Sequence, residues 1–177
     1  KLGTSWEISQ SYIQRDTNNT FKTINDDKFN LILDGSEYNL VYSPNDKRYH
    51  TKIETFMLIE NRTNGNNSLG KYWIVRTKDG TSYRFGYTRN SEAISSMYNY
   101  TWRWNLDLVN DTHSNRIFYT YKENPFPADI GAVYLYKVEY NNDIKRVIEF
   151  KYESSNRSDL RLIYEDGNKL RESRRLN

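Results

Sequence analysis

The sequence has no cysteine among its 177 residues, only two histidines, and very little alanine. Without cysteine there is no disulfide framework, no thiolate metal site and no cysteine nucleophile. The scarcity of alanine, the best helix former, argues against a helical protein. No apolar run approaches the ~18 residues that a membrane-spanning helix requires. These absences leave the cellular compartment open, because many surface proteins also lack cysteine.

Aromatic residues are the main source of apolar area in this composition. The chain has 16 Tyr, 7 Phe and 4 Trp, although hydrophobic residues make up only 36% of it. Aromatic side chains favour strands and bury large areas, so the chain can form a core. Its 26 basic and 23 acidic residues are interleaved along most of its length, which is typical of a solvated surface. We therefore expect an all-β protein with no nucleic-acid partner.

Alternating apolar and polar residues indicate a series of short strands. Asp34-Gly35-Ser36 separates two such segments as a hairpin turn would. At Asp79-Gly80, glycine tolerates the positive φ of a type I′ hairpin turn. The pattern predicts an antiparallel meander of successive hairpins, with strands at 6–12, 29–33, 38–42, 52–59, 72–75, 83–85, 102–108, 117–121, 134–140, 146–152 and 160–164.

Candidate catalytic or metal-binding groups are few. His50 and His113 have no second ligand at metal-binding spacing, and no nucleophile elbow, phosphate loop or dinucleotide-binding glycine motif occurs. The carboxylates that could act as an acid–base pair on a glycoside are Asp107 with Asp111 and Glu139 with Glu149. Charged residues on strands usually point to solvent, so we assign these pairs to the surface. We predict no catalytic residue, no cofactor and no metal.

Two readings of the tryptophans and nearby tyrosines remain open. Trp73 and Trp104 alternate with Ile and Leu, which favours positions in the core of a sheet. The segment containing Tyr98, Tyr100 and Trp102 is less regular. If exposed, these three rings would form a platform for a surface glycan, because aromatic faces stack on the apolar faces of sugars.

Six sequons mark candidate N-glycosylation sites. The sequence has the form Asn-x-Ser/Thr at each of them, which is the acceptor motif in secreted proteins. The sites are Asn18, Asn61, Asn66, Asn99, Asn110 and Asn156.

The order of several motifs resembles the N-terminal region of SpvB-type proteins and of the B components of insecticidal toxin complexes. Leu2-Gly3-Thr4-Ser5-Trp6-Glu7-Ile8-Ser9 resembles the opening strand of that family, and Asp79-Gly80-Thr81 with Tyr83-x-Phe85-Gly86 resembles its central hairpin. Tyr164-Glu165-Asp166-Gly167-Asn168-Lys169-Leu170 resembles one unit of a tyrosine–aspartate (YD, or Rhs) repeat. The second half adds Trp104-x-Leu106, Asp111, Asn115, Tyr119-x-Tyr121, Tyr134-Leu135-x-x-Val138-x-Tyr140, Ile148-x-Phe150-x-Tyr152, Asp159 and Arg174-x-Leu176.

This resemblance implies a β-sheet element of a large secreted shell or cell-surface scaffold. The family's toxic chemistry lies in separate C-terminal domains, so none is implied for this chain. An ADP-ribosylating Glu-x-Glu pair, associated with the SpvB name, does not occur here. Ser114 replaces the family's usual glycine in the turn after Asp111, which predicts a looser turn.

The chain is predicted to be one β-rich segment of a longer polypeptide, because its ends are abrupt. Within it we expect opening strands and a central hairpin at 1–89, a loop or short helix at 90–101, and YD-like hairpins at 102–177. The expected function is structural: a non-catalytic scaffold that assembles with the rest of its own polypeptide or shell, outside the cell. The alternative is an extracellular carbohydrate-binding or adhesin module; a glycan-acting enzyme ranks last.

Overall fold

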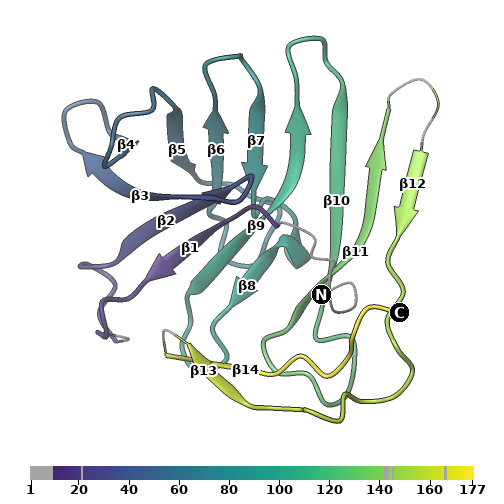
Figure 1. Cartoon of the computed structure of the whole chain (residues 1–177). Helices are drawn as coiled ribbons and strands as arrows, with labels where there is room; N and C mark the ends of the chain where they lie inside the picture. The colour runs from purple at the N-terminus through teal and green to yellow at the C-terminus, as the bar shows by residue number, and fades with distance from the viewer. Residues whose placement is uncertain (1–9, 21, 142–143, 145, 166) are drawn as a thin grey trace.

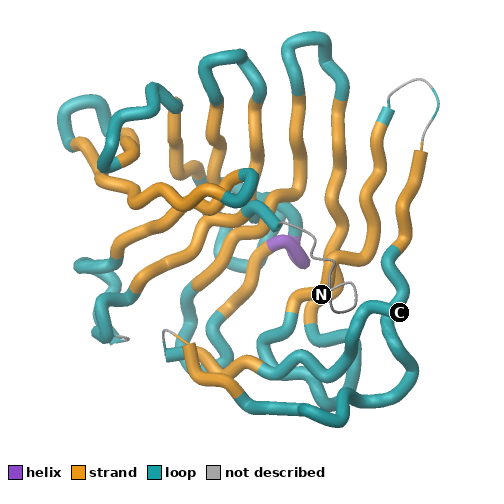
Figure 2. The backbone as a smooth tube through the Cα atoms, viewed as in Figure 1, coloured by secondary structure: helices purple, strands orange, loops and turns teal. Residues whose placement is uncertain are grey.

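The computed structural model describes residues 10–20, 22–141, 144, 146–165 and 167–177. Over these ranges the chain is all-β, with a single turn of 3-10 helix, η1 (Arg89–Ser91), as Figure 2 shows. The first strands are β1 (Tyr12–Asp16), β2 (Lys28–Leu33), β3 (Ser36–Ser43), β4 (Arg48–Thr51), β5 (Leu58–Arg62), β6 (Tyr72–Arg76) and β7 (Ser82–Phe85). The others are β8 (Glu92–Ile94), β9 (Thr101–Asn110), β10 (Arg116–Glu123), β11 (Val133–Tyr140), β12 (Arg146–Glu149), β13 (Ile163–Glu165) and β14 (Asn168–Leu170).

Most strands form one antiparallel sheet that closes on itself. Strands β1 to β7 pair in sequence order, β7 pairs with β9, and β9 pairs with β1, which completes a ring (Figure 1). The ten-residue strand β9 makes this closure possible: its first half pairs with β1 and β8, and its second half with β7 and β10. Strands β10, β11 and β12 continue the sheet outward from the ring. The expected meander of antiparallel hairpins is confirmed.

The core lies inside the ring, where alternate side chains of each strand converge. Trp73 and Trp104 are 0% and 1% exposed, and their ring centroids lie 5.9 Å apart in an edge-to-face arrangement. Ile13, Leu31 and Phe85 are fully buried around them. The prediction that both tryptophans are core residues is confirmed.

The two predicted hairpin turns form, with different geometry. Asp34 and Gly35 both have positive φ, +50° and +81°, as a two-residue type I′ turn requires. The connection at Asp79-Gly80 is longer, because the last pair of the hairpin is Arg76 with Ser82. Only Gly80 has positive φ in that loop, and its N–H donates to the carbonyl of Thr77. The type I′ prediction is therefore wrong at this second turn.

The turn after Asp111 is tighter than expected. Ser114 adopts φ +66°, the left-handed conformation for which glycine is favoured. The Asp111 carboxylate compensates by accepting from the backbone N–H groups of His113 and Asn115, both at 2.8 Å. Asp111 N–H also donates to the Asn115 carbonyl. The loose turn predicted from Ser114 is not found.

Two predicted strands begin later than the sequence pattern suggests. Residues 52–57 are not a strand, and β5 starts only at Leu58. Thr55 N–H donates to Thr51 Oγ1, and such local bonds compete with a sheet ladder. At the C-terminal end β13 starts at Ile163 rather than at residue 160. The segment 90–101 holds the end of η1, β8 and a short loop, and contains no α-helix.

The residues that follow β12 leave the sheet and fold back beneath it. Phe150 is only half-buried, and Tyr152 joins Leu176 in an isolated bridge instead of extending β12. The hairpin β13–β14 is a separate two-stranded sheet below β8 and β9 (Figure 1). The opening segment around Trp6, Asn142 of the expected Asn-Asn turn, and Asp166 of the YD-like unit lie outside the described residues. No helix of the described part has the length and apolarity needed to cross a membrane.

Candidate interaction surfaces

Asp107 is a buried structural carboxylate, not a surface group. The pairing of β7 with β9 shifts register between Arg84 and Phe85, which leaves Asp107 opposite no residue of β7. Its Oδ1 accepts from Arg84 Nε at 2.7 Å, and its Oδ2 from Ser91 Oγ at 3.0 Å. It is 2% exposed because the segment containing η1 folds over this side of the sheet. The expectation that Asp107 faces solvent is wrong. Its carboxylate accepts hydrogen bonds from Arg84, Ser91 and the Thr88 N–H within the folded chain.

The other three carboxylates have different surroundings. Asp111 is in the turn already described, where hydrogen bonds from Asn115 hold the pKa of its carboxyl below the usual value. Glu139 pairs with Lys137 at 2.8 Å. Glu149 is exposed on β12, where it lies opposite Lys137 in the ladder. The structure therefore does not bring the candidate acid–base pairs into a common cleft.

The histidines do not form a metal centre with neighbouring acids. His50 is on β4; its Nε2 lies 2.8 Å from Asp46 Oδ2, and its Nδ1 lies 4.0 Å from Glu54 Oε2. The described residues contain no group of three or more His, Cys, Asp or Glu side chains arranged to hold a metal ion. The hydrogen bonds from Ser43 and His50 lower the pKa of Asp46.

The proposed aromatic platform is mostly buried. Tyr100 and Trp102 are 6% and 2% exposed, so their faces are closed to a large glycan. Tyr98 is half-buried and lies parallel to Tyr100, with centroids 6.1 Å apart. The guanidinium of Arg15 lies 5.1 Å from the ring centre of Tyr100, and that of Arg103 lies 4.3 Å from Trp102. Tyr100 and Trp102 pack with Ala93 of β8 in a second buried apolar cluster. The exposed-platform hypothesis therefore fails at two of its three residues.

Most of the sequons are accessible. Asn110, on β9, is only half-buried, and its side chain takes part in hydrogen bonds with Asp111 and Arg116. The exposed acceptor residues are Asn18, Asn61, Asn66, Asn99 and Asn156. Accessibility permits glycosylation of these five; whether they carry glycans stays a prediction.

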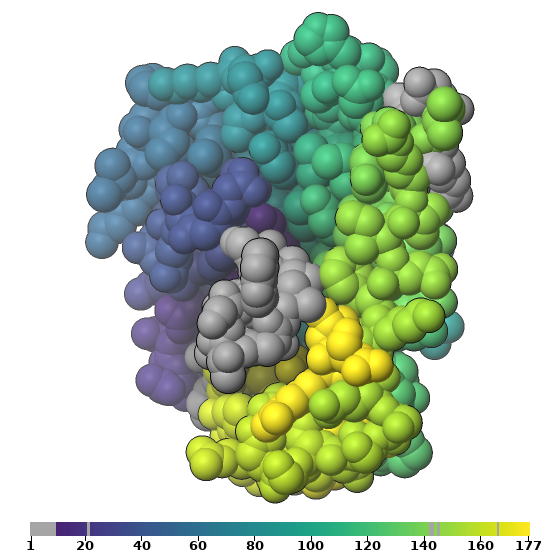
Figure 3. Space-filling model, turned by 45° about the vertical axis from the view of Figure 1, so that its right-hand side comes forward, coloured from purple at the N-terminus to yellow at the C-terminus, as the bar shows by residue number. Residues whose placement is uncertain are grey.

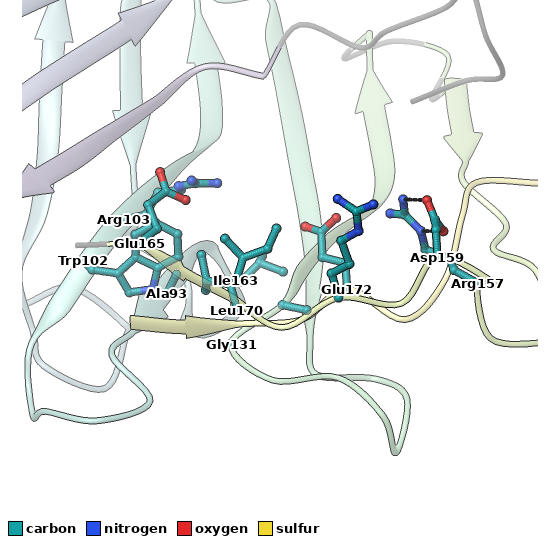
Figure 4. Close-up of a pocket in the computed structure, with 13 residues that line it drawn as sticks. Ala93, Trp102, Arg103, Gly131, Arg157, Asp159, Ile163, Glu165, Leu170 and Glu172 are labelled. Atoms are coloured by element: carbon teal, nitrogen blue, oxygen red, sulfur yellow. Dashed lines mark hydrogen bonds and ion pairs between the residues drawn. The ribbon is translucent and has the colours of Figure 1, made fainter. Parts of the chain in front are cut away.

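A cleft of about 500 Å³ separates strands β8 and β9 from the hairpin β13–β14 (Figure 4). Trp102, Ile163 and Leu170 line its apolar end. At its other end Asp159 accepts two 3.0 Å bonds from Arg157 and also pairs with Arg175. The bonds from Arg157, and then that from Arg175, hold the pKa of Asp159 well below its usual value. At this end, Asp159 is paired with Arg157 and Arg175. The cleft is a seam between strands β8 and β9 and the C-terminal segment.

Asp129 fastens the C-terminal segment to the sheet extension. Its Oδ1 accepts from the hydroxyls of Tyr134 and Ser173, at 2.9 and 2.6 Å, and from the Ser173 N–H. Ile130 and Arg171 add two backbone hydrogen bonds, and Arg171 Nε donates to the Ala128 carbonyl. Figure 3 shows the C-terminal residues lying against β13–β14 and the end of the extension. The sequence analysis did not predict these contacts, because no local pattern links Asp129 to residues about forty positions later.

The free edge of the sheet extension is apolar. β12 pairs only with β11 among the described strands, and all four of its residues are exposed. Its central Val147 and Ile148 are 45% and 48% exposed, although they point to opposite faces. On β13, Ile163 and Tyr164 are 56% and 64% exposed. An exposed strand edge with apolar side chains is a site where another strand or chain can add.

Comparisons with known proteins show likeness of fold. No family model matches the chain, and no curated protein matches it. The N-terminal domain of effector protein SpvB from Salmonella typhimurium strain LT2 matches with a TM-score of 0.74 and 18% identity, over 96% of this chain and 74% of that one. A chain of the Photorhabdus luminescens Tc holotoxin pore gives 0.72 and 14%, over 99% of this chain and 11% of that one. A chain of the TcdB2-TccC3-Cdc42 crystal structure gives 0.69 and 15%, over 97% and 11%.

The resemblance drawn from the motifs is thus confirmed at the level of the fold. The chain spans about three quarters of the SpvB domain and about a tenth of the Tc chains. The YD-repeat character of the C-terminal hairpin is not tested by this likeness and stays a prediction.

Proposed function

We propose that this chain is a non-catalytic structural module, one wall element of a larger toxin-complex-like shell or surface scaffold that works outside the cell. The observation that carries the proposal is the open, apolar edge at β12. Ile144, which precedes β12 in the chain, is also exposed. The likeness to short stretches of the much longer Tc chains supports the same reading.

Physical reasoning links this edge to assembly. A sheet that ends freely in water is usually protected by charge, proline or a covering loop, because unpaired backbone groups invite association. β12 has charged residues at its two ends, Arg146 and Glu149, but its centre is Val147-Ile148. Adding a neighbouring strand would satisfy its free backbone groups and cover these side chains. The partner that we propose is the remainder of the same polypeptide.

The test replaces Val147 and Ile148 with lysine in the longer natural polypeptide that contains this segment. Because both side chains are about half exposed, the 177-residue chain alone should change in stability by no more than about 0.5–1 kcal/mol. In the longer protein, the double variant should expose β12 to limited proteolysis and raise its amide hydrogen exchange. Ile53→Lys is the matched control: Ile53 is 84% exposed and is in the connection between β4 and β5, two strands that lie on the opposite side of the molecule from β12 (Figure 1). Equal protection of β12 in wild type and double variant would contradict the proposal.

The non-catalytic part of the proposal has its own test. Asp111→Ala changes a partly exposed carboxylate in a turn, and Glu149→Ala changes an exposed one on the edge strand β12. Assembly of the longer protein should be unaffected by either. A variant that kept native stability but lost biological function would reveal a chemical site and refute this part.

The extracellular part is tested through the sequons. If the native host glycosylates secreted proteins, intact-mass analysis should show glycan mass on at least one of the five exposed acceptors. Asn99 and Asn156 are the preferred sites, because both are exposed and lie outside the strands. An unmodified chain from such a host would count against secretion by that route.

A further inference from the structure

A second cavity, of about 500 Å³, opens at one end of the strand ring. It lies where β1 and β3 end and where β2 and β4 begin, at the left of Figure 1. Its volume is within the roughly 300–1,000 Å³ typical of small-molecule sites, and the open ends of closed sheets are common places for them. It is separate from the seam and from the edge described above.

Aromatic rings form one wall of this cavity. Phe29 and Tyr49 meet edge to face with centroids 5.7 Å apart, and Tyr42 lies 5.2 Å from Tyr49. Trp104 closes the inner end, where it belongs to the core. Tyr42 is 49% exposed, so its ring is available to a ligand. Such rings offer flat apolar surfaces, on which the C–H faces of a sugar ring stack.

A buried carboxylate lies beside these rings with one oxygen unused. The side chain of Asp27 is 2% exposed, and its Oδ2 pairs with Arg15 Nη1. Its Oδ1 is buried and has no hydrogen-bond partner among the described residues. Leaving a buried acceptor unsatisfied destabilises the protein, and the penalty is larger for a charged group. A ligand hydroxyl donating to Oδ1 would recover that free energy.

Arg15 holds this carboxylate in a fixed position. Its guanidinium lies 5.3 Å from the ring centre of Phe29 and 5.6 Å from that of Trp104. Its Nε also donates to the Thr101 carbonyl at 2.8 Å. Because the arginine is anchored on three sides, Asp27 is preorganised, and little order has to be created on binding.

Charge decides what kind of ligand fits. The Arg15–Asp27 pair is neutral as a unit, which leaves the ammonium groups of Lys28 and Lys71, both on exposed residues of the lining. A cationic ligand would meet these two charges, and a purely apolar one would leave Asp27 unsatisfied. The amide of Asn61 adds a neutral donor and acceptor at the rim.

We infer that this cavity binds an acidic sugar, with a hydroxyl donating to Asp27 Oδ1, the ring against Tyr42 and Tyr49, and the carboxylate toward Lys28 and Lys71. This ligand class matches each feature of the lining: aromatic faces, a buried acceptor and surplus positive charge. The site is distinct from the Tyr98 to Trp102 segment, and it would give a wall element an additional function in recognising acidic glycans.

The test titrates the full 177-residue chain with D-glucuronate, D-glucose and acetate by ¹H–¹⁵N NMR. Glucuronate should bind saturably, while glucose should bind roughly tenfold more weakly because it lacks one charge-assisted contact. Acetate should not bind saturably, because it has the charge without the ring. If acetate binds as tightly as glucuronate, the cavity is only an anion site and the inference is overturned.

Variants locate the binding. Tyr42→Ala should weaken glucuronate and glucose alike, whereas Lys28→Gln combined with Lys71→Gln should remove only the preference for the acid. These side chains are exposed, so the folded spectrum should persist. The matched controls, Tyr164→Ala on β13 and Lys151→Gln after β12, should leave both affinities unchanged. Binding that is unaffected by the cavity variants, or no saturable shift with up to ~50 mM glucuronate, a concentration well above the millimolar Kd of a weak site, would refute the site.

Discussion

Replacing Trp104 with alanine is the most direct test of how the ring is held together. The indole is 1% exposed and packs edge to face on Trp73 at 5.9 Å, with Phe29 at the same distance. Its Nε1 donates to the Lys71 carbonyl at 3.0 Å. Trp104 also pairs with Ile13 of β1 in the ladder that closes the ring.

Two contributions set the size of the effect. Removing a buried tryptophan to alanine usually costs about 3–5 kcal/mol, through lost transfer free energy and the cavity left behind. Losing the hydrogen bond and leaving the Lys71 carbonyl unpaired adds about 1 kcal/mol. We expect Trp104→Ala to lower the free energy of unfolding by about 4–6 kcal/mol, a large part of the roughly 5–15 kcal/mol of a typical domain.

The assay is urea unfolding followed by circular dichroism, because the substitution removes one of the tryptophans that a fluorescence measurement would use. Trp104→Phe keeps an aromatic ring but loses the hydrogen bond. It is the milder variant to measure if Trp104→Ala does not fold. Phe150→Ala is the matched control: Phe150 is only half-buried, so its loss should be about 1–2 kcal/mol, below the roughly 3–5 kcal/mol of a fully buried aromatic. A Trp104→Ala effect equal to or smaller than the Phe150→Ala effect would refute the assignment of the core.

Three further outcomes follow from individual contacts. Gly86→Ala should destabilise the chain by more than about 2 kcal/mol, measured by thermal unfolding, because φ is +71° and an added Cβ would lie 2.2 Å from Trp104 Cδ1; an unchanged midpoint would contradict this. Asp107→Asn should cost about 2–4 kcal/mol in urea unfolding, since it uncouples a buried pair, whereas Asp111→Asn on the exposed turn should cost under about 1 kcal/mol; the reverse order would be inconsistent with the structure. Burial raises the pKa of Tyr121 above its ordinary value of 10.0. The neutral phenol therefore stabilises the fold below pH ~10, and this contribution is lost as the pH rises toward the folded pKa. Tyr121→Phe should make the free energy of unfolding fall less steeply at alkaline pH, and a slope identical to wild type would exclude Tyr121 as the cause.

Local sequence patterns were sufficient for the hairpins. Asp34-Gly35 specifies its turn because both positions tolerate positive φ, and the alternation around Trp73 marks which side chains face inward. The same signals failed at residues 52–57, where apolar residues alternate but the Thr51 hydroxyl accepts a hydrogen bond from the Thr55 N–H. Apolar alternation shows what a segment could bury, and it does not reveal a local bond that competes with pairing.

The candidate cavity could not be found in the sequence. Arg15 and Asp27 lie on either side of one loop, while Tyr49, Lys71 and Trp104 come from strands and loops spread over the first two thirds of the chain. None of them forms a motif with another. They meet because closing the ring brings the ends of several strands to one opening, and Asp27 becomes buried only there.

The sequence by itself determined the all-β class, the antiparallel hairpins and the core positions of Trp73 and Trp104, because composition, turn residues and period-two alternation act within a few positions. Only the tertiary structure decided the closure of the ring, in which Ile13 pairs with Trp104 although about half of the chain separates them in sequence. It also decided the burial of Asp107, since a bulge in β9 and the segment over it turned a predicted surface carboxylate inward. Such outcomes depend on which distant strands meet, and the pairing of distant strands is not contained in any local pattern.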